Sequence, residues 1–336
     1  MSEQYHNDPE LKARHEEINP LLDKAGWNIQ NYKVANPHSS KGVAVEFFQI
    51  GREQADYVLF VNGQAVGIIE AKKPGESLTG KEFQTSKYAK GFHEEFDSIE
   101  LPLPFLYESN GSETRFTNLW DAKPRSREVF AFHKPEAMEE WIKKGKKENL
   151  RFKLAQNVPY KNKDLWAVQK EAIEKTKESL AYGKPRALIQ MATGSGKTFT
   201  AINLCYDLIK NAGAKRILFL VDRGNLGKQT EQELENFVIP NDGRKFTELY
   251  NVQRLKSNKI EGVNKVVIST IQRMYSILKG EKKLDPEKEE DEGFMADPNM
   301  EVEPLKYNKN IPIEEFDFVI IDESHRSIYN LWKQVL

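Results

Sequence analysis

The chain has 336 residues, of which 39% are hydrophobic and 30% are charged. This length suggests two domains, and this composition is typical of globular proteins in solution. The formal net charge of −1 excludes a surface that is basic overall, so nucleic-acid binding would have to depend on local clusters of Lys and Arg.

Cysteine content and the apolar runs exclude several further classes of protein. Cys205 is the only cysteine, which excludes an internal disulfide and a cysteine-based zinc site and fits a reducing compartment. Residues 1–17 are polar and lack the apolar core of a signal peptide, and apolar runs such as residues 217–221 are too short to span a bilayer. We therefore expect a cytoplasmic protein without a membrane partner.

The first zone of the chain, up to about residue 130, has the pattern of a helix followed by strands. Residues 9–26 carry apolar side chains at helical spacing. Strands are expected over residues 43–50, 55–61, 64–72, 101–111 and 113–120, and a further helix over residues 77–96. Asn62 and Gly63 form a turn signal that is typical of a hairpin between the second and third of these strands.

From about residue 160 the pattern changes to strands that alternate with helices. Strands are expected over residues 186–192, 216–222, 265–274 and 316–323, and helices over residues 165–182, 197–211 and 225–237. This alternation predicts a parallel α/β sheet. Residues of about 279–310 are charged and poor in aliphatic side chains, so we expect a solvated insertion there. The predicted organisation is an α/β domain over residues 1–145, a connector over 146–160, and a parallel-sheet α/β domain over 161–336.

The segment QMATGSGKTFTAINL, residues 190–204, follows an expected strand and opens an expected helix. The loop positions predicted to bind phosphates are Thr193, Gly194, Ser195 and Gly196. Lys197 would reach the β and γ phosphates, and the hydroxyl group of Thr198 would bind Mg²⁺. The general form of this loop has glycine where Met191 stands. Residues 192–198 resemble the variant of the loop found in superfamily 2 helicases.

The segment FDFVIIDESH, residues 316–325, ends an apolar strand with two carboxylates. Ligands of open α/β sheets bind at the carboxyl ends of the strands, so Asp322 would hold the Mg²⁺ of ATP and Glu323 would orient the attacking water. By resemblance to the same helicases, His325 would couple the nucleotide state to the rest of the protein, and Gln169 would contact the adenine. The plainer alternatives are an unrelated glycine loop, a surface histidine and a glutamine on a helix surface.

The strand residues Glu70 and Lys72 are two apart, so both side chains should project from one face. If the Asn62-Gly63 turn is a two-residue loop, Asp56 pairs with Ile69 and faces away from Glu70. With a three-residue loop and a bulge, Asp56 lies opposite Glu70. Only the second register, or a kink at Asp56, would let two carboxylates share Mg²⁺ beside Lys72. A solvated strand end is the plainer alternative.

These three polar residues of the hairpin resemble the core of PD-(D/E)XK nucleases. Gln84 and Tyr88 are spaced i, i+4 on an expected helix and would share one face. A Gln and a Tyr at this spacing after the lysine are seen in the RecB-like branch of these nucleases. Glu17 and Glu46 are weaker candidates for a third carboxylate.

Further contacts to nucleic-acid phosphates are expected from segments that resemble the strand-contacting segments of helicases. The candidates are Arg223, Gln229, Thr270 and Gln272. Basic clusters at residues 123–127 and 143–147 are further candidates for contact with the phosphate backbone. All of these positions are equally explained as solvated surface.

Taken in order, the segments resemble the restriction (R) subunit of type I restriction-modification enzymes over essentially the whole chain. The resemblance is carried by residues 51–75, 113–125, 190–201, 218–229 and 319–327. It implies a RecB-like PD-(D/E)XK nuclease domain and a first RecA-like superfamily 2 helicase domain. It also implies ATP and Mg²⁺ as cofactors, with ATP-dependent translocation on unmethylated foreign double-stranded DNA and Mg²⁺-dependent cleavage of it. The implied partners are double-stranded DNA and the methylase (M) and specificity (S) subunits.

This family's motor has a second RecA-like domain, which the sequence lacks after its Asp-Glu motif. Since ATP is hydrolysed between two such domains, we expect weak ATP binding, impaired hydrolysis and no translocation by this chain. Two alternatives stay open at this point. One is a nucleic-acid-binding superfamily 2 helicase fragment without nuclease activity, and the other is a non-enzymatic remnant.

Overall fold

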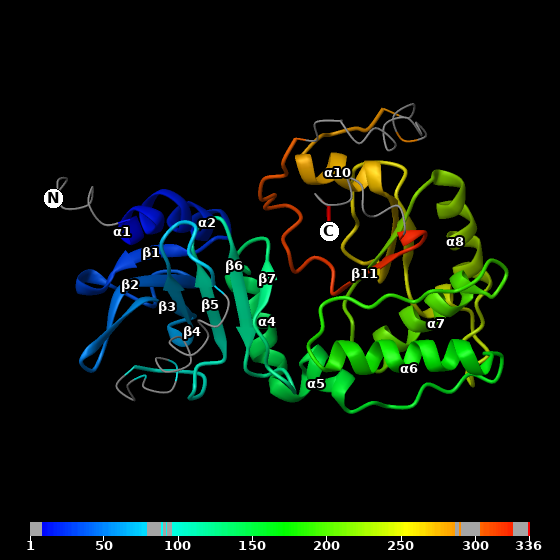
Figure 1. Ribbon diagram of the computed structural model, residues 1–336, viewed down its shortest axis with the longest axis horizontal. Coiled ribbons are helices and arrows are strands. Elements are labelled where there is room, and N and C mark those ends of the chain that lie inside the picture. The colour runs from blue at the N-terminus through cyan, green and yellow to red at the C-terminus, as the bar shows by residue number, and fades with distance from the viewer. Residues whose placement is uncertain are drawn as a thin grey trace. The chain divides into compact units, whose positions relative to one another are not determined.

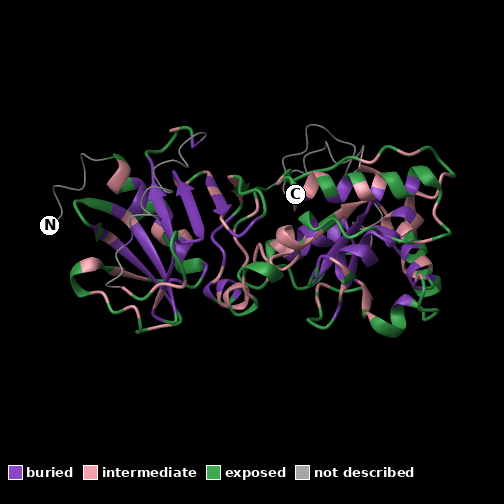
Figure 2. Ribbon diagram, turned by 90° about the horizontal axis from the view of Figure 1, so that it is seen from below, coloured by how far each residue is buried: buried purple, intermediate pink, exposed green. Residues whose placement is uncertain are grey.

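The computed structural model describes residues 9–78, 89, 92, 96–285, 289, 303–324 and 335–336. The chain divides into two compact units, and each has buried strands at its centre (Figure 2). The first unit comprises Met1–Ala155, Ala181–Pro185 and Pro312–Glu314, and the second comprises Gln156–Leu180, Arg186–Ile311 and Glu315–Leu336. None of the helices formed by the described residues has the length and apolar character that a bilayer span requires.

The first unit contains a seven-stranded mixed sheet whose strands lie side by side in sequence order (Figure 1). The strands are β1 (Asn28–Asn31), β2 (Gly42–Ile50), β3 (Glu53–Val61), β4 (Gln64–Ala71), β5 (Phe105–Ser109), β6 (Thr114–Asn118) and β7 (Arg127–Val129). The pairs β1–β2 and β4–β5 are parallel, and the other neighbours are antiparallel.

Short helices accompany this sheet. They are α1 (Pro9–Ala13), the π-helical turn η2 (Arg14–Ile18), α2 (Asn19–Lys24), the 3-10 turns η3 (Tyr32–Val34) and η4 (Lys146–Glu148), α4 (Pro135–Lys144) and α5 (Leu150–Ala155). The helix expected over residues 9–26 is therefore present, with a π-helical turn at its centre. The structure places η4 and α5 in the first unit, within the stretch expected to connect two domains. Most of the helix expected over residues 77–96 lies outside the described residues.

Both faces of the first sheet are covered by apolar side chains. Tyr57 and Leu59 on β3 belong to a core cluster that also contains Ile18, whereas Val58 and Phe60 belong to the cluster on the opposite face. Successive side chains of a strand point to opposite faces, so an apolar run without alternation indicates a strand buried on both sides. Each such side chain contributes roughly 1.5–3 kcal/mol on burial, which makes these strands a firm support for polar groups at their ends.

Strands β4 and β5 approach each other closely at Gly67. A Cβ atom at this position would lie 2.1 Å from the backbone oxygen of Phe105. Only glycine permits this approach, because real Cβ atoms do not come so near to a backbone oxygen. The contact holds the parallel β4–β5 pair together next to the end of β4, where Glu70 follows.

The second unit contains a four-stranded sheet of order β11-β8-β10-β9, and its paired strands are all parallel. The strands are β8 (Ile217–Val221), β9 (Val252–Arg254), β10 (Val266–Thr270) and β11 (Phe318–Ile321). The helices are α6 (Ala167–Ala181), α7 (Lys197–Lys210), α8 (Gly224–Asn236), α9 (Phe246–Leu249) and α10 (Ile271–Lys279). The predicted fold class, α/β in both parts with a parallel sheet in the second, is confirmed.

One strand prediction in the second unit is wrong, and another extends too far. Residues 186–192 form no strand, and Leu188 is 80% exposed. Strand β11 pairs with β8, and no described strand pairs with its other edge, so residues 186–192 stay outside the sheet although that edge is open. The strand expected over residues 265–274 ends at Thr270, where α10 begins, because the Thr270 side chain accepts a hydrogen bond from the backbone N–H of Arg273 and caps the helix.

Candidate functional site

The hairpin between β3 and β4 uses a two-residue loop. Val61 pairs with Gln64, so only Asn62 and Gly63 lie between the strands. Their φ angles are 52° and 86°, which is the left-handed conformation that a type I′ turn needs at both central positions. The loop is therefore the shorter of the two that the sequence allowed.

A register shift further into the hairpin nevertheless gives the pairing that the longer loop would have produced. The shift lies between Leu59 and Phe60, where β4 carries an extra residue, and beyond it Tyr57 pairs with Ile69. Continuing this register by one residue places Asp56 opposite Glu70. Because of this bulge, the length of the Asn62-Gly63 loop does not determine which residues of β3 and β4 lie opposite each other at the far end of the hairpin.

Strand β3 also turns over at Asp56. Ala55 and Tyr57, which would share a face in a regular strand, belong to the core clusters on opposite faces of the sheet. On the neighbouring strand β2, Phe47 has a φ angle of 57°, which is uncommon for a residue with a side chain. The kink at Asp56 that the sequence left open is therefore present, and it redirects the Asp56 carboxylate.

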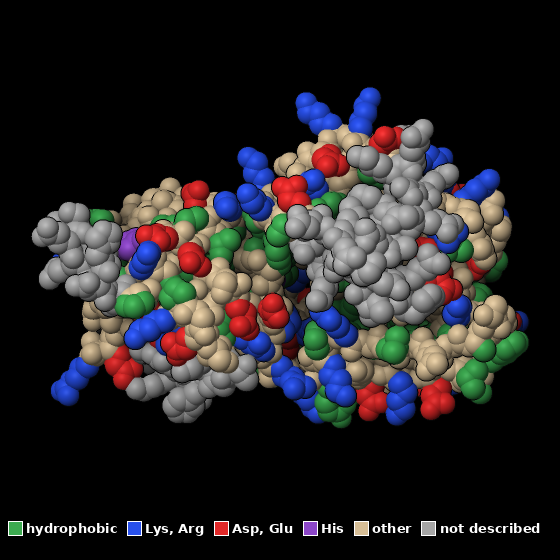
Figure 3. Space-filling model, turned by 45° about the horizontal axis from the view of Figure 1, so that its top comes forward, with side chains coloured by type: hydrophobic (Ala, Val, Ile, Leu, Met, Phe, Trp, Pro, Cys, Tyr) green, Lys and Arg blue, Asp and Glu red, His purple; other side chains and the backbone are tan. Residues whose placement is uncertain are grey.

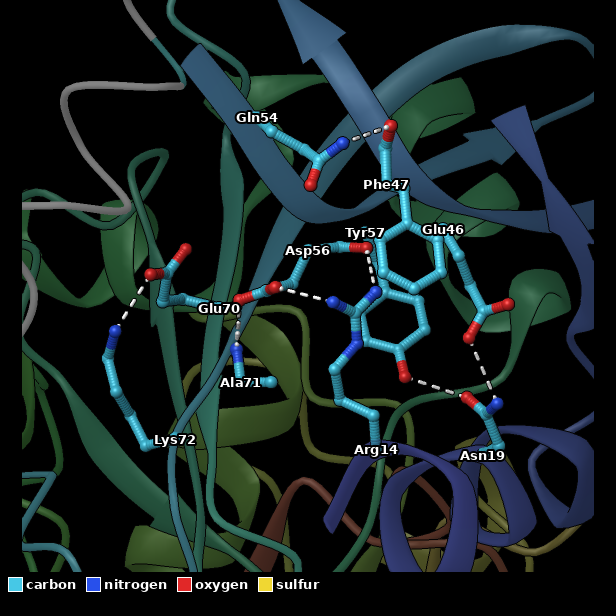
Figure 4. Close-up of polar contacts among 10 residues, drawn as sticks. All are labelled: Arg14, Asn19, Glu46, Phe47, Gln54, Asp56, Tyr57, Glu70, Ala71 and Lys72. Carbon is cyan, nitrogen blue, oxygen red and sulfur yellow. Dashed lines mark hydrogen bonds and ion pairs between the residues drawn. The ribbon is translucent and has the colours of Figure 1, made fainter. Parts of the chain in front are cut away.

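The Asp56 carboxylate is held by two donors. Nη1 of Arg14 donates to Oδ1 at 2.8 Å, and the backbone N–H of Ala71 donates to Oδ2 at 2.8 Å (Figure 4). Nη2 of Arg14 also donates to the backbone oxygen of Asp56 at 2.9 Å. Burial raises the pKa of Asp56, while the positive charge of Arg14 and the hydrogen bond from Ala71 act in the opposite direction.

Glu70 and Lys72 form a buried ion pair beside Asp56. Nζ of Lys72 lies 2.7 Å from Oε1 of Glu70, and the side chain of Lys72 is 10% exposed and that of Glu70 is 4% exposed. Burial and the charge of Asp56 raise the pKa of Glu70 to about 7. Burial lowers the pKa of Lys72, but the hydrogen bond and charge of Glu70 outweigh that effect, so the pKa is raised overall and Lys72 stays protonated near neutral pH.

The carboxylates of Asp56 and Glu70 fit a divalent cation. Oε2 of Glu70 is buried and has no hydrogen-bond partner among the described residues, so it offers lone pairs to a ligand. Mg²⁺ prefers carboxylate oxygens and commonly uses one or two of them, with waters completing its octahedron. No group of three or more His, Cys, Asp or Glu side chains within the described part of the chain could hold a metal ion. These residues would therefore supply a two-carboxylate site.

The raised pKa of Glu70 predicts a pH-dependent stability for the first unit without metal. The pKa is about 7 in the folded protein against an ordinary 4.5, so the folded state binds this proton more tightly. The stabilisation is complete below the unfolded value and is lost as the pH rises through about 7. We expect the contribution of Glu70 to the free energy of unfolding to fall by roughly 1–3 kcal/mol between about pH 5 and about pH 8. Burial lowers the pKa of His133 in the same unit from 6.5 to about 3, which raises stability as the pH rises, so the contribution of Glu70 is the difference between the wild type and Glu70→Gln. Denaturant titrations at a series of pH values, with EDTA to remove metal, measure this change in the free energy of unfolding.

Replacing Glu70 by Gln should flatten this pH dependence. The exposed Glu128, on β7 of the same unit, provides the matched control, and Glu128→Gln should keep the wild-type profile. A Glu70→Gln profile that parallels the wild type between these two pH values would contradict the assignment.

Other residues near this site were either missed or given little weight from the sequence. Arg14 was missed, although it lies four residues before Ile18 and so places a charge within the apolar stripe of its helix, which was the available signal. Glu108 was also missed. It is buried on β5 and is the register partner of Glu70. Glu46 accepts a hydrogen bond from Asn19 at 3.0 Å.

The remaining candidates of the first unit do not gather at the hairpin or cannot be placed. Glu17 is exposed on η2, which agrees with the solvated alternative. Gln84 and Tyr88 lie outside the described residues, so their predicted role stays a prediction. Within the basic cluster 143–147, Lys143 and Lys144 each pair with a glutamate one helical turn away, at 2.7 Å.

The glycine-rich loop of the second unit has the backbone conformation that its sequence predicts. Gly194 and Gly196 both have a φ angle of 79°, and α7 begins at Lys197. Nε2 of Gln169 donates to the backbone oxygen of Ser195 at 2.9 Å, so this glutamine braces the loop from α6. Thr193 is exposed at the mouth of the loop.

The structure brings the loop lysine and the acidic motif together. Nζ of Lys197 lies 3.0 Å from Oε1 of Glu323, directly after β11. The Glu323 hydrogen bond and charge raise the pKa of Lys197. Asp322 and Thr198 are both half-buried, and the Asp322 carboxylate accepts a hydrogen bond from the backbone N–H of Glu323 at 3.0 Å. His325 lies outside the described residues.

The four further phosphate-contact candidates lie in different environments. Gln229 is exposed and donates to Glu233 at 3.0 Å, whereas Gln272 is buried. Arg223 precedes α8 and pairs with Asp222, and the Thr270 hydroxyl donates to Glu289. On the face drawn in Figure 3, basic and acidic side chains are interspersed, in agreement with the balanced net charge.

Two family profiles match the chain. Residues 26–123 match the "Type I restriction enzyme EcoKI endonuclease subunit second domain", and this range contains Asp56, Glu70 and Lys72. Residues 162–336, just over half of the chain, match the family "Type III restriction enzyme, res subunit", and this range contains the glycine-rich loop and the acidic motif.

Curated relatives are similar over most of the chain. The type I restriction enzyme EcoKI endonuclease subunit of Escherichia coli K12 is 27% identical over 92% of this chain, and the EcoAI endonuclease subunit of Escherichia coli is 28% identical over 81% of it. The alignments cover 28% and 31% of those proteins, so the chain spans less than a third of their length.

A solved fragment assigned to an HsdR subunit of a type I restriction enzyme from Vibrio vulnificus YJ016 aligns over 97% of this chain and 53% of that chain. It has 19% identity and a TM-score of 0.32, which is too low to support an inference. The family matches and the curated relatives agree with one another: the chain belongs to the restriction enzyme family that its residues 162–336 match, and within it to the endonuclease subunits of type I restriction enzymes.

Proposed function

We propose that the first unit cleaves DNA with Mg²⁺ held by Asp56 and Glu70. The observation that carries the proposal is the register of the hairpin, which continued by one residue beyond Tyr57 and Ile69 would set Asp56 opposite Glu70, with Lys72 paired to Glu70 at 2.7 Å. The unoccupied lone pairs of Glu70 Oε2 and the match of this unit to an endonuclease subunit domain support it further.

The reaction would be hydrolysis of a phosphodiester. An attacking water gives up a proton to solvent and forms a new P–O bond, while the bond from phosphorus to the leaving sugar oxygen breaks and that oxygen takes up a proton. A bound Mg²⁺ would lower the pKa of that water and offset the charge that develops on the phosphate. Lys72, whose pKa is raised by the hydrogen bond and charge of Glu70, would stabilise that negative charge. Asp56 would be kept in place by Ala71 and Arg14.

Cleavage of supercoiled plasmid in Mg²⁺ tests the proposal. Glu70→Ala should reduce the cleavage rate of the full chain by about 10²-fold or more, because it removes a metal ligand and the partner of Lys72. Glu128→Ala removes an exposed carboxylate of the same unit and should cleave like the wild type. Equal cleavage by Glu70→Ala and the wild type would refute the assignment. No Mg²⁺-dependent cleavage by either would favour a nucleic-acid-binding helicase fragment without nuclease activity.

We also propose that the second unit binds ATP with Mg²⁺. The loop glycines, Lys197 at the start of α7 and the proximity of Lys197 to Glu323 support this assignment. Thr198 and Asp322 are the residues that would hold the ion, and Glu323 would orient the attacking water. Gln169 would contact the base only if it gave up part of its present role in bracing the loop.

The whole enzyme's activity and partners follow from the relatives as proposals. We infer that the chain acts within a type I restriction enzyme that moves along double-stranded DNA with ATP and cleaves DNA that lacks the host's methylation, in defence against phage. Its partners would be DNA and the methylase and specificity subunits, and its location the cytoplasm. The support is the similarity to two type I endonuclease subunits.

A further inference from the structure

Arg14 is built into the cluster of charges at the end of the β3–β4 hairpin. Its side chain is 4% exposed, and it makes two hydrogen bonds to Asp56, one to the carboxylate and one to the backbone. The guanidinium carbon lies 4.1 Å from the ring centroid of Phe47 and 4.9 Å from that of Tyr57. A cation enclosed by two aromatic rings and a carboxylate is well stabilised where it stands.

Irregular backbone converges on this arginine. Arg14 begins the π-helical turn η2, and Phe47, whose ring it contacts, has the left-handed φ angle of 57°. π-Helical turns and left-handed non-glycine residues cost free energy and cluster at functional sites. An ion pair on the surface would need neither the π-helical turn nor the positive φ angle of Phe47, so the backbone around Arg14 indicates a functional site.

The two ion pairs at this site are balanced in charge. Arg14 with Asp56 and Lys72 with Glu70 contribute two positive and two negative formal charges, so these four groups sum to zero. Glu108, the buried register partner of Glu70, and Glu10, whose charge raises the pKa of Glu70, lie outside these two ion pairs. A divalent cation that enters between Asp56 and Glu70 would therefore meet two carboxylates already neutralised, and it would be repelled by Arg14 at close range in a buried site.

A DNA phosphate would change this balance. Bound beside the cation, it adds a negative charge that attracts both the cation and Arg14 and so offsets the repulsion between them. We propose that Arg14 holds Asp56 in position and, through its charge, keeps the divalent ion weakly bound until a DNA phosphate occupies the site. The inference rests on the proposed role of Asp56 and Glu70 as metal ligands.

Calorimetric titration of Mn²⁺ into the full chain without DNA tests the proposal. Arg14→Gln removes the charge and should bind Mn²⁺ at least about tenfold more tightly than the wild type. Arg14→Lys retains the charge and should bind like the wild type. Lys12→Gln is the matched control, because Lys12 lies on the same helix with its side chain 59% exposed, and its affinity should not change. In the double variant Arg14→Gln/Glu70→Ala the gained affinity should disappear.

In a second measurement the main result comes from the wild type, so it does not depend on the folding of any variant. A short phosphorothioate duplex, which resists cleavage, should raise the Mn²⁺ affinity of the wild type at least about tenfold and should raise that of Arg14→Gln less. Unchanged or weaker Mn²⁺ binding by Arg14→Gln, or a wild-type affinity that the duplex does not alter, would overturn the proposal. Neither result depends on cleavage, so this inference can fail while Glu70→Ala still abolishes nuclease activity.

Discussion

Replacing Lys197 by alanine is expected to weaken the binding of ATP–Mg²⁺ to the second unit by about 30-fold or more. Lys197 is the first residue of α7. It follows the loop in which Gly194 and Gly196 have positive φ angles, and it pairs with Glu323. Its charge would be shared with the phosphates when nucleotide binds, and charge-assisted hydrogen bonds of this kind contribute roughly 2–3 kcal/mol. Titration with a fluorescent ATP analogue measures the change in Kd.

Lys210→Ala serves as the control for this experiment. Lys210 ends the same helix, 13 positions after Lys197, and the side chain packs over the ring of Tyr206. Its removal changes the charge of α7 by the same amount and leaves the glycine loop untouched, so the affinity for the analogue should stay within about twofold of the wild type. Equal affinities of Lys197→Ala and Lys210→Ala would exclude the loop as the nucleotide site.

Replacing Lys177 by methionine is expected to lower the free energy of unfolding of the second unit by about 3–5 kcal/mol. Nζ of Lys177 lies 2.6 Å from Oδ2 of Asp207, and the two side chains are 4% and 0% exposed, so the pair joins α6 to α7 within the core. Lys177 also donates to the backbone oxygen of Val158 at 2.7 Å. Methionine has a similar length but would leave the Asp207 charge buried without its cation. Denaturant unfolding measures the loss.

Two further variants separate this ion pair from a general effect of charge. Lys175 is 70% exposed and pairs with Glu178 on the surface of the same helix, so Lys175→Met should change stability by no more than about 0.5 kcal/mol. The double variant Lys177→Met/Asp207→Leu replaces both partners with apolar groups and should recover most of the loss. If Lys177→Met were as mild as Lys175→Met, the buried pair could not be what joins the two helices.

Local sequence patterns were sufficient wherever neighbouring residues alone fix the conformation. Asn62 and Gly63 predicted the hairpin turn, because both can adopt positive φ angles, whereas its length was left open between two and three residues. The glycine loop and the start of α7 at Lys197 followed from the spacing of Gly194 and Gly196. In each case the determining interactions lie within a few residues of one another, so the pattern contains them.

Strand predictions failed where a partner strand was required. Residues 186–192 contain Arg186 and Gln190, whereas β8 is apolar throughout. Strand β8 pairs with both β10 and β11, but residues 186–192 have no paired strand in the described part of the chain. An apolar run indicates that a strand would be buried if it paired, and it does not indicate that pairing occurs, even where an edge such as that of β11 is open. That information comes from the rest of the sheet.

The sequence by itself determined the two α/β units, the turn chemistry and the residue types of both sites, because these depend on periodicity and on short-range conformational preference. Only the tertiary structure decided the register that, continued beyond Tyr57 and Ile69, places Asp56 opposite Glu70, since a bulge in β4 sets it independently of the loop. It also decided that Arg14, 42 residues before Asp56, supplies the opposing charge. Which charged side chains face one another depends on burial and on contacts between residues far apart in the sequence, and a pattern of neighbouring residues does not contain this information.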